Sequence, residues 1–518
     1  MSAPSLSATD RRGIALRLFL TCWLLYALHF ATNTVREIYP ALSLGDHLSF
    51  DVSEYVGLHP DIFELPGRGA FINNNPGASI LGALPYTLAR PVIDRIVERI
   101  QRARAASNAP PPNYDTIYPM AREFFREAYR RGLDVKFGLA AGVMQAFLMA
   151  PLAALSVVVM FFLLASRLTV RAALWLGLLY GFATPILYRT AQLNQNVLIS
   201  HCALFAFALL WRPWDNAAQP VRSERPLYLL AGLLCGWAVV LDYSGLVVVF
   251  GISVYVVLRW RALPAEQKSL RDLLEFGAGV LAGVAVLFAY QWLAFGNPFL
   301  PAQHYMPPTP YSRYGLNGID LPQLDLLWDT AFGIRFGLFF SAPILFLVVY
   351  VPGWLNARTR IVGSREIAFI LIFTIALFLF ASANQFGRLQ FNSGVRYIVP
   401  ASPFLFLLAA TVLVNIPRVL ATVIGIFTTY WSWCLAMYRD VEQGLGVFES
   451  IIHITREGLR LPWLTTLERL GYVSSGPVLI LILILTVIIL WTIWNVHLPF
   501  KPLRWWGNRQ QEQQAPRV

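Results

Sequence analysis

The stretch "FGLAAGVMQAFLMAPLAALSVVVMFFLLA", residues 137–165, is apolar along its whole length and contains no charged side chain. A helix needs about 20 such residues to cross the ~30 Å hydrocarbon core of a membrane. The whole chain shares this character, since 57% of its 518 residues are hydrophobic and only 14% are charged. Soluble proteins carry roughly 25% charged residues. The sequence therefore predicts an all-α polytopic membrane protein.

Similar apolar blocks lie on both sides of this stretch, and they indicate about twelve membrane-spanning helices. The predicted spans are 13–33, 137–165, 171–188, 197–211, 227–241, 245–257, 276–295, 336–355, 367–382, 398–414, 419–437 and 476–494. Lysine and arginine gather in alternate short connections, and this bias predicts that both termini are cytoplasmic. Three longer segments are then external, namely 34–136, 296–335 and 439–475. We see no internal repeat and no separate soluble domain, so residues 1–518 form one integral membrane domain.

The net charge of +12 does not indicate nucleic-acid binding, because the charges punctuate the apolar blocks and form no basic face. Positive residues at cytoplasmic loop ends explain most of the excess. The four cysteines lie inside apolar blocks without a CxxC spacing, so they suggest neither a zinc site nor a disulfide framework. They are Cys22, Cys202, Cys235 and Cys434.

The first external segment contains "FINNNPGASILGALPY", residues 71–86, which predicts the start of a helix. Asn75 suits a helix cap and Pro76 suits the first helical position, whereas Pro85 and Pro91 should bend or break the early turns. Apolar residues then recur every three or four positions as far as Ile100. We expect amphipathic helices lying at the outer membrane interface, here and at 118–132. A platform on the membrane surface without a catalytic role and a catalytic lid both fit this pattern.

The stretch "SLGDHLSFDVSEYVGLHPDIFEL", residues 43–65, precedes that helix and contains four candidate acids, Asp46, Asp51, Glu54 and Asp61. A carboxylate at a membrane surface can act as a general base toward a sugar hydroxyl or bind a divalent cation. Acids after glycine or proline are also common in turns and helix caps. No motif specifies a metal, so a divalent cation stays an open alternative.

Several segments, taken together and in order, resemble the bacterial membrane glycosyltransferases of the GT-C superfamily, which depend on polyprenyl-phosphate sugars and are related to protein mannosyltransferases. "GRGAFINNNPGASILGALPY" is similar to the first-loop signature of that family, and "SGVRYIVPASPFLFLL" is similar to its most characteristic late block. The other similar segments are "GFATPILYRTAQLNQNVLISH", "AGLLCGWAVVLDYSGLVV", "FGNPFLPAQHY" and "GIRFGLFFSAPILF". The resemblance covers most of the chain.

This resemblance implies a GT-C-like fold and transfer of a hexose or pentose from a polyprenyl phosphate to an acceptor, usually with inversion. A first-loop carboxylate would deprotonate the acceptor hydroxyl. Many relatives carry an aspartate just after the first span, where this chain has Asn33 and Thr34. Asp61 is therefore our first candidate for the base, followed by Asp51 and then by Asp46 and Glu54. Glu37 is nearest the usual position.

Basic residues near the external ends of spans are candidates for binding the donor phosphate. Arg396 begins a span beside Tyr397, where its guanidinium can bind phosphate bidentately or simply anchor the helix at the interface. His201 is an ionisable residue within an apolar block, which suggests either function or a hydrogen-bonded core position. Further candidates are Arg36, Arg335 and Arg388 for the phosphate, Asn73, Asn75, Pro76 and Gly77 for the loop motif, and His304 and Tyr305 for the acceptor side.

The sequence is thus interpreted as a glycosyltransferase of the bacterial inner membrane, with its active site on the external, periplasmic face. Its partners would be a polyprenyl-phosphate sugar, membrane lipid and an envelope lipid, glycan or protein acceptor, and not nucleic acid. One alternative is a transporter or flippase, although those commonly show two similar halves with sites near the midplane. The other is a noncatalytic lipid-binding relative, which the missing aspartate after the first span favours.

Overall fold

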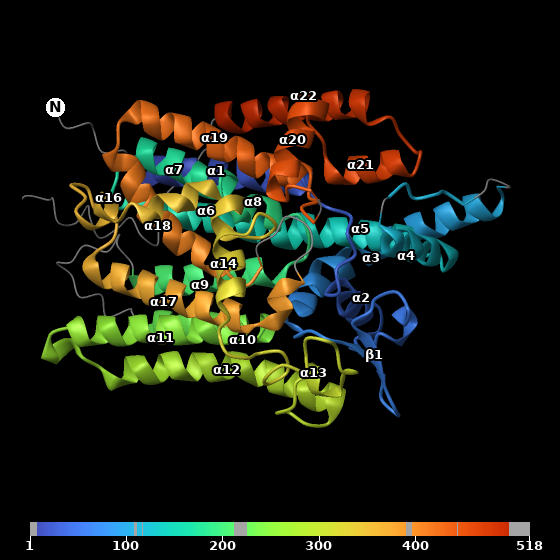
Figure 1. The fold of residues 1–518 in the computed structure, drawn as a ribbon, viewed down its shortest axis with the longest axis horizontal. Coiled ribbons are helices and arrows are strands. Elements are labelled where there is room, and N and C mark those ends of the chain that lie inside the picture. Colours follow the sequence, from blue (N-terminus) through green and yellow to red (C-terminus); the bar gives the residue numbers. More distant parts are fainter. Residues whose placement is uncertain are drawn as a thin grey trace, which may run out of the picture.

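The computed structural model describes residues 8–107, 111–116, 118–211, 225–389, 396–442 and 444–496. Most helices run side by side along the long axis of the molecule, and one end carries the first loop (Figure 1). The helices are α1 (Ala8–Leu28), α2 (Ile38–His47), α3 (Gly77–Ala105), α4 (Pro119–Arg130), α5 (Asp134–Met144), α6 (Ala150–Ala165), α7 (Val170–Phe182), α8 (Pro185–Arg189), α9 (Gln195–Trp211), α10 (Arg225–Leu241), α11 (Gly245–Ala262), α12 (Leu270–Phe295), α13 (Ala302–Tyr305), α14 (Leu324–Phe332), α15 (Leu338–Ser341), α16 (Val351–Leu355), α17 (Ser364–Ala383), α18 (Ser402–Asn415), α19 (Arg418–Met437), α20 (Val447–Glu457), α21 (Pro462–Arg469) and α22 (Ser475–Asn495).

The prediction of a polytopic helical membrane protein is confirmed. Among the described residues, six helices are long and apolar enough to cross a membrane. They are Asp134–Ala165, Gly245–Ala262, Leu270–Phe295, Ser364–Ala383, Arg418–Met437 and Ser475–Asn495. Four shorter apolar helices lie at Val170–Phe182, Gln195–Trp211, Leu227–Leu241 and Val399–Asn415. Each of these ten overlaps a predicted span.

The predicted span at 336–355 is wrong as one continuous helix. The structure has α15, a 3₁₀ segment at Pro343–Val349 and then α16. Pro343 and Pro352 stand at the start of the second and third pieces, and each lacks the N–H that would continue the preceding helix. Hydropathy gave the correct apolar character here, whereas proline decided the local geometry.

The predicted span at 171–188 is also divided. Helix α7 ends at Phe182, and α8 starts at Pro185 after Thr184 accepts a hydrogen bond from the N–H of Ile186. Proline is favoured at the first position of a helix because its missing N–H would have no helical partner there. The break brings Arg189 and the following polar residues to the end of the bundle that carries the first loop.

The first loop contains a β-hairpin, which the sequence analysis did not predict, in addition to helices. After α2 and a short 3₁₀ turn at Ser53–Tyr55, a two-stranded antiparallel hairpin forms from β1 (Ile62–Leu65) and β2 (Gly69–Ile72). Ile62 pairs with Ile72 at the base of the hairpin. The residues that flank the two strands, Asp61 and Asn73, therefore lie next to each other.

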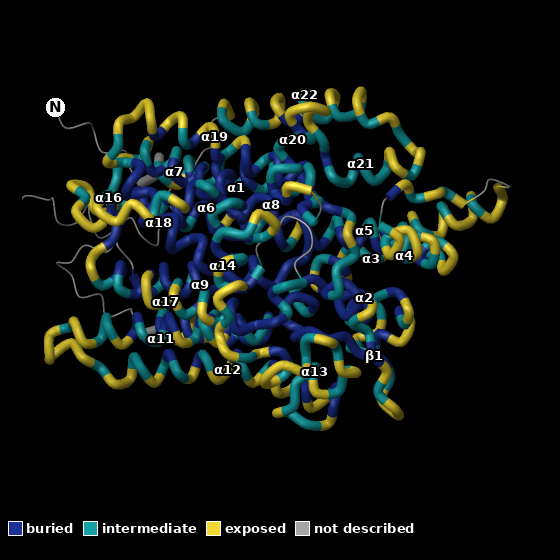
Figure 2. The backbone as a smooth tube through the Cα atoms, viewed as in Figure 1, coloured by how far each residue is buried: buried dark blue, intermediate teal, exposed yellow. Residues whose placement is uncertain are grey.

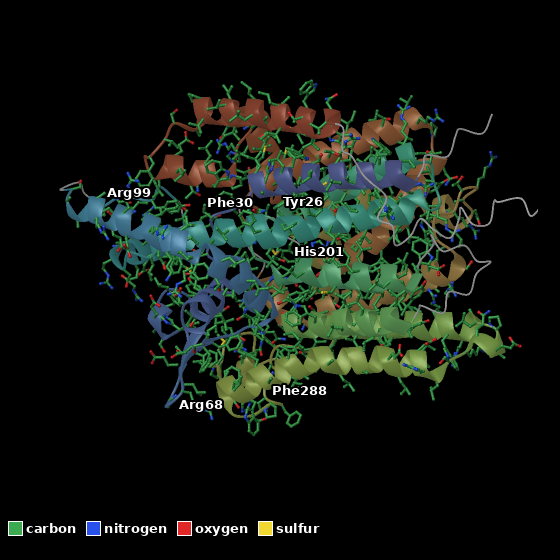
Figure 3. All side chains as sticks on the ribbon, turned by 180° about the vertical axis from the view of Figure 1, so that it is seen from behind. Tyr26, Phe30, Arg68, Arg99, His201 and Phe288 are labelled. Atoms are coloured by element: carbon green, nitrogen blue, oxygen red, sulfur yellow. The ribbon has the colours of Figure 1, made fainter. Side chains whose placement is uncertain are left out.

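Helix α3 confirms the helix expected after Asn75, but two details differ. Pro85 and Pro91 lie inside an α-helix that continues from Gly77 to Ala105, so neither ends it. Asn75 does not cap the helix, because its side-chain nitrogen donates to the carbonyl oxygen of Val239 at 2.8 Å. Helices α3 and α4 project beyond the bundle, with Arg99 near the tip (Figure 3).

The projecting helix carries the amphipathic pattern that the sequence predicted. Leu84, Leu88 and Val92 lie one turn apart along α3 and are exposed. Arg95 and Arg99 are exposed farther along the same helix. Exposed leucine and valine beside arginine are typical of a helix at a membrane interface. An interfacial position for α3 stays a prediction.

The buried core runs along the middle of the bundle, whereas α12 and α22 are exposed along their outer sides (Figure 2). Helix α22 contacts α1 near its end, where Trp494 Nε1 donates to Thr21 Oγ1 at 3.0 Å. Helix α1 starts and α22 ends on the side opposite the first loop (Figure 1). The structure therefore places the beginning of the first span and the end of the last span on one side of the molecule.

Candidate active site

A cavity of about 2300 Å³ lies between the first loop and the connections at the same end of the bundle. Polar residues line it from the stretches 32–37, 192–196 and 437–440, and aromatic or aliphatic residues line it from α4, α5 and α21. Sites for one small ligand usually measure about 300–1,000 Å³. This cavity therefore has room for a long apolar substrate or for two substrates together.

The cavity contains an arginine held between two carboxylates. Arg36 Nη1 donates to Asp61 Oδ2 at 3.2 Å, and Arg36 Nε donates to Glu37 Oε1 at 3.3 Å. Arg36 Nη1 also donates to the carbonyl oxygen of Asn73 at 3.1 Å, while the N–H of Asn73 donates to the carbonyl oxygen of Asp61 at 3.1 Å. The base of the β-hairpin thus positions Asp61 against Arg36.

The two carboxylates differ in how well a substrate can reach them. The side chain of Asp61 is 29% exposed, and that of Glu37 is 9% exposed. Although burial opposes the charge of Arg36, Glu37 and Asp61 raise the pKa of its guanidinium above the ordinary value. One guanidinium between two carboxylates leaves net negative charge, which suits a general base. Asp61 is the more accessible of the two.

His59 helps to fix Asp61. The backbone N–H of Asp61 donates to His59 Nδ1 at 3.0 Å, so the ring proton is on Nε2 when His59 is neutral. Burial lowers the pKa of His59 from 6.5 to about 4, with Asp61 opposing the shift and Arg36 reinforcing it. His59 is therefore neutral at pH 7 and acts as an acceptor that orients the loop before β1.

This histidine predicts a specific loss of stability in acid. Between pH 6.5 and about 4 the unfolded chain protonates His59 and the folded protein does not, so unfolding becomes more favourable as the pH falls. The loss should reach about 3 kcal/mol, at 1.36 kcal/mol per pKa unit. In His59→Gln the amide oxygen can still accept from Asp61, and we expect a smaller loss across this range in thermal unfolding of the detergent-solubilised protein. Parallel pH curves for the two proteins would contradict the assignment.

Two buried arginines line the same cavity. Arg189 is the last residue of α8 and is 4% exposed, and Arg439 lies just after the end of α19 and is 8% exposed. Burial, together with repulsion from Arg439 and Arg396, lowers the pKa of Arg189 to about 9. Burial lowers the pKa of Arg439 to about 10. Both guanidiniums remain charged at pH 7, in surroundings that disfavour a cation unless an anion accompanies it.

Arg439 has donors that the described part of the chain does not use. Its Nη1 donates to the carbonyl oxygen of Tyr188 at 3.2 Å, whereas its Nε and Nη2 atoms have no hydrogen-bond partner among the described residues. Arg396 also lines the cavity and lies over the ring of Tyr397, 5.1 Å from its centroid. Three arginines from distant parts of the sequence thus form a candidate site for an anion such as phosphate.

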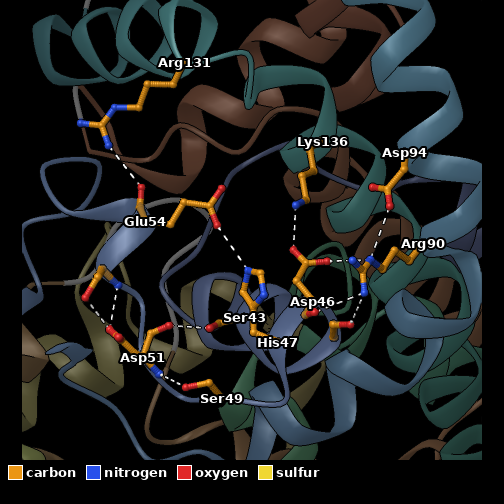
Figure 4. A network of polar contacts seen from close by, with 12 residues as sticks. Ser43, Asp46, His47, Ser49, Asp51, Glu54, Arg90, Asp94, Arg131 and Lys136 are labelled. Atoms are coloured by element: carbon orange, nitrogen blue, oxygen red, sulfur yellow. Dashed lines mark hydrogen bonds and ion pairs between the residues drawn. The ribbon is translucent and has the colours of Figure 1, made fainter. Parts of the chain in front are cut away.

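The other three of the four predicted acids, Asp46, Asp51 and Glu54, lie outside the residues that line the cavity, and Figure 4 shows their contacts. Asp46 accepts from Lys136 Nζ at 2.7 Å and from Tyr86 Oη at 2.9 Å. Asp51 Oδ1 accepts from the N–H of Ala70 at 2.9 Å and so holds β2. Glu54 is largely exposed, 3.9 Å from His47. Among the four predicted acids, Asp61 alone lines the cavity.

Asp46 therefore has a structural role that can be tested. Asp46→Asn leaves Lys136 and Arg90 close to a neutral side chain, and breaking such a pair within a buried environment costs about 3 kcal/mol or more. We expect a lower unfolding temperature. Glu54→Gln is the matched control, since Glu54 is exposed and its loss should leave the unfolding temperature unchanged. An unchanged unfolding temperature in Asp46→Asn would contradict a structural role for Asp46.

The remaining predicted cations are not among the residues that line the cavity. Arg335 is exposed, and Arg388 pairs with Asp325 at 2.7 Å. His201 is buried inside α9 next to Phe205, with a ring separation of 6.0 Å (Figure 3). On the predicted acceptor side, His304 is exposed and Tyr305 stacks on Phe295 with ring centroids 4.9 Å apart; neither lines the cavity.

The loop motif divides into one cavity residue and a packing element. Asn73 lines the cavity, and its Oδ1 atom is buried without a hydrogen-bond partner among the described residues. Asn75 bonds to α10, as described above. Pro76 stands just before α3, and a Cβ on Gly77 would lie 2.7 Å from the carbonyl oxygen of Val240. The glycine therefore permits the close approach of α3 to α10.

The sequence analysis missed Arg189, Arg439 and Asp242. Asp242 lines the cavity and accepts from Gln195 Nε2 at 3.0 Å. Arg189 and Asp242 both lie inside motifs quoted for the family resemblance, yet each looks like an ordinary connection residue. One sequence feature could have identified such residues: each is a charged residue next to a long apolar run, in an external connection with few other charges.

The described residues do not form a recognisable metal site. Within them, no group of three or more histidine, cysteine, aspartate or glutamate side chains gathers closely enough to hold a metal ion. The predicted divalent cation therefore has no matching set of ligands in this part of the chain.

No protein-family model and no curated protein sequence matches the chain. Two solved structures are similar to it. Against ArnT from Cupriavidus metallidurans in the apo state, the TM-score is 0.49 with 16% identity over 83% of this chain and 64% of that chain. Against the Archaeoglobus fulgidus oligosaccharyltransferase in the apo form, the TM-score is 0.38 with 12% identity over 88% of this chain and 56% of that chain.

This chain spans less than two thirds of the length of each matched protein. At identities below 25% and TM-scores below 0.5, these likenesses identify neither the substrate nor the catalytic residues of this chain. Its apolar helices make it a multi-pass membrane protein.

Proposed function

We propose that this protein is a membrane glycosyltransferase that moves a sugar from a polyprenyl-phosphate donor to an acceptor hydroxyl of an envelope lipid, glycan or protein. One observation carries the proposal. A single large cavity contains both an accessible carboxylate, Asp61, and three arginines, Arg189, Arg396 and Arg439. Sugar transfer from a phosphate needs these two kinds of group: a base for the acceptor and cations for the departing phosphate.

The proposed step is a single displacement. Asp61 takes the proton of the acceptor hydroxyl as that oxygen forms a bond to the anomeric carbon of the donor sugar. The bond from the anomeric carbon to the phosphate oxygen breaks, and polyprenyl phosphate leaves with the bonding electron pair. Attack from the face opposite the leaving group inverts the configuration at that carbon. Arg36 holds Asp61 in place through the contact between its Nη1 atom and Asp61 Oδ2.

The arginines act on the leaving group. As the bond to the anomeric carbon breaks, negative charge grows on the phosphate, and guanidiniums already in position stabilise it without reorganisation. Burial strengthens this effect because little water competes with it. The apolar lining near Phe30, Leu139 and Trp463 suits the isoprenoid part of such a donor.

The proposed setting is the bacterial inner membrane, with both termini cytoplasmic and the active site on the external face. The distribution of lysine and arginine supports this orientation. The structure supports the relative placement, since the start of α1 and the end of α22 lie opposite the first loop (Figure 1). A donor with a lipid tail also requires a site near the membrane surface.

The experiment is a donor screen with the full-length protein in nanodiscs. Polyprenyl-phosphate glucose, galactose, mannose and arabinose are incubated with an envelope extract, and free polyprenyl phosphate and glycosylated products are followed by mass spectrometry. We expect one donor to be consumed and its sugar to appear on an acceptor. Binding of donors without consumption across extracts would favour a noncatalytic lipid-binding protein. Movement of intact donor across a sealed membrane without consumption would favour a flippase.

A further inference from the structure

A row of buried amides lines the cavity next to Arg189. Gln192 lies in the connection between α8 and α9, and Gln195 and Asn196 begin α9. These three residues are 9%, 2% and 2% exposed, respectively. Asn73, at the base of the hairpin, is 7% exposed and lines the same cavity. These four residues are called the amide group below.

The amide group shares an unusual feature. Within the described residues, the side-chain carbonyl oxygen of each member is buried without a hydrogen-bond partner: Asn73 Oδ1, Gln192 Oε1, Gln195 Oε1 and Asn196 Oδ1. Leaving such an acceptor unsatisfied is unfavourable, because the oxygen has lost its hydrogen bonds to water without gaining others. Buried polar groups in proteins nearly always have partners. Several such oxygens lining one cavity therefore indicate a ligand that brings hydrogen-bond donors.

The orientation of Gln195 is fixed by its surroundings. Its Nε2 atom donates to Asp242 Oδ2 at 3.0 Å, and an ionised carboxylate can only accept. Asp242 is held in turn by the backbone N–H of Ser244, which donates to its Oδ1 atom at 2.8 Å. The amide of Gln195 therefore cannot rotate by 180° without losing this bond, and its carbonyl oxygen is left as the free end.

We infer that the amide group is the subsite for the donor sugar, that it selects a sugar with free hydroxyl groups, and that Asp242 is a positioning residue that presents Gln195 Oε1 to one of those hydroxyls. This inference rests on the proposed function. Gln192 follows Arg189 by three residues, so a subsite here adjoins the candidate phosphate site. The sugar of the donor is bonded directly to that phosphate, so the two subsites must be neighbours.

The test separates the affinity for the lipid phosphate from the affinity for its sugar. Dissociation constants are measured in nanodiscs for polyprenyl phosphate and for polyprenyl-phosphate glucose, galactose and mannose. We expect wild type to bind the best of the three sugars at least tenfold more tightly than polyprenyl phosphate. Gln195→Met, which keeps the volume and removes the acceptor, should reduce that gain about tenfold, the value of one hydrogen bond. Binding of polyprenyl phosphate alone should not change.

Asp242→Asn tests the positioning role. The new amide presents an N–H₂ group to Gln195, whose own amide then turns and directs its nitrogen into the cavity. We expect the sugar gain to fall as it does in Gln195→Met, and the double variant to fall no further than either single variant. Unchanged binding of polyprenyl phosphate shows that each variant is folded. The control is Gln385→Met, because Gln385 is buried but does not line the cavity.

The results that would overturn the proposed function differ from those that would overturn the sugar subsite. Absence of polyprenyl phosphate binding, or binding that Arg439→Gln does not weaken, would overturn the proposed function. Binding that depends on Arg439, but with no gain from an attached sugar, would overturn the sugar subsite alone. A sugar gain that survives in Gln195→Met would also overturn it. A gain lost in Gln195→Met but kept in Asp242→Asn would overturn the positioning role of Asp242.

Discussion

Asp61→Asn should lower the rate of sugar transfer by about a thousandfold, within the range typical of a lost general base. Asparagine has nearly the same shape as aspartate and can still accept a hydrogen bond from Arg36, but it cannot take the acceptor proton. Binding of the donor should change little, because the carboxylate acts on the acceptor. The measurement is a single-turnover assay of polyprenyl phosphate release with donor bound in advance.

Two controls make the Asp61 result specific. Asp46→Asn changes another aspartate of the first loop, one that does not line the cavity, and its rate per folded molecule should be that of wild type. Glu37→Gln removes the other partner of Arg36, and we expect a smaller loss of rate because Glu37 is less accessible. Loss of transfer in Glu37→Gln with full transfer in Asp61→Asn would show that Glu37 is the base.

Arg439→Gln should lower the transfer rate by about a hundredfold or more, as expected for removing one group that stabilises transition-state charge. Its affinity for polyprenyl phosphate should also fall, because the phosphate loses a cationic partner both when it is bound and as it departs. The amide keeps one donor for the carbonyl oxygen of Tyr188. Single-turnover kinetics and a binding isotherm for polyprenyl phosphate measure the two effects separately.

Arg335→Gln is the matched control for charge. Arg335 is exposed, and it is not among the residues that line the cavity. Rate and affinity should both stay at the wild-type value. If Arg335→Gln weakened polyprenyl phosphate binding as much as Arg439→Gln, a general electrostatic attraction would explain the result and the arginine site would be wrong.

The membrane character of the fold was predictable because apolar length is a local property of the sequence. The apolar stretch 137–165 correctly predicted a membrane-spanning helix, and so did most of the other predicted spans. The broken stretch at 336–355 was not predicted as broken, since hydropathy averages over Pro343 and Pro352. The β-hairpin was also missed, because strands of four residues leave little alternation to detect.

The candidate site was predictable only in part. The sequence gives four acids close together in the first loop, and spacing alone cannot separate them. The hairpin separates them in space, since it places Asp61 on the cavity beside Arg36 and uses Asp51 to hold its second strand. Arg189 and Arg439 are far apart in the chain, so only the packing of α8 near the end of α19 shows that they share a cavity.

The central claim is that one cavity binds the phosphate of the donor through the arginines. The anomeric carbon of the donor sugar then faces Asp61. The most direct measurement is a cryo-electron microscopy structure of the full-length protein in nanodiscs with polyprenyl phosphate bound. We expect the phosphate within hydrogen-bonding distance of Arg439 and at least one of Arg189 and Arg396, with Asp61 across the space left for the sugar. A phosphate bound at another group of cations, such as Arg90 and Lys136, would contradict the proposed active site.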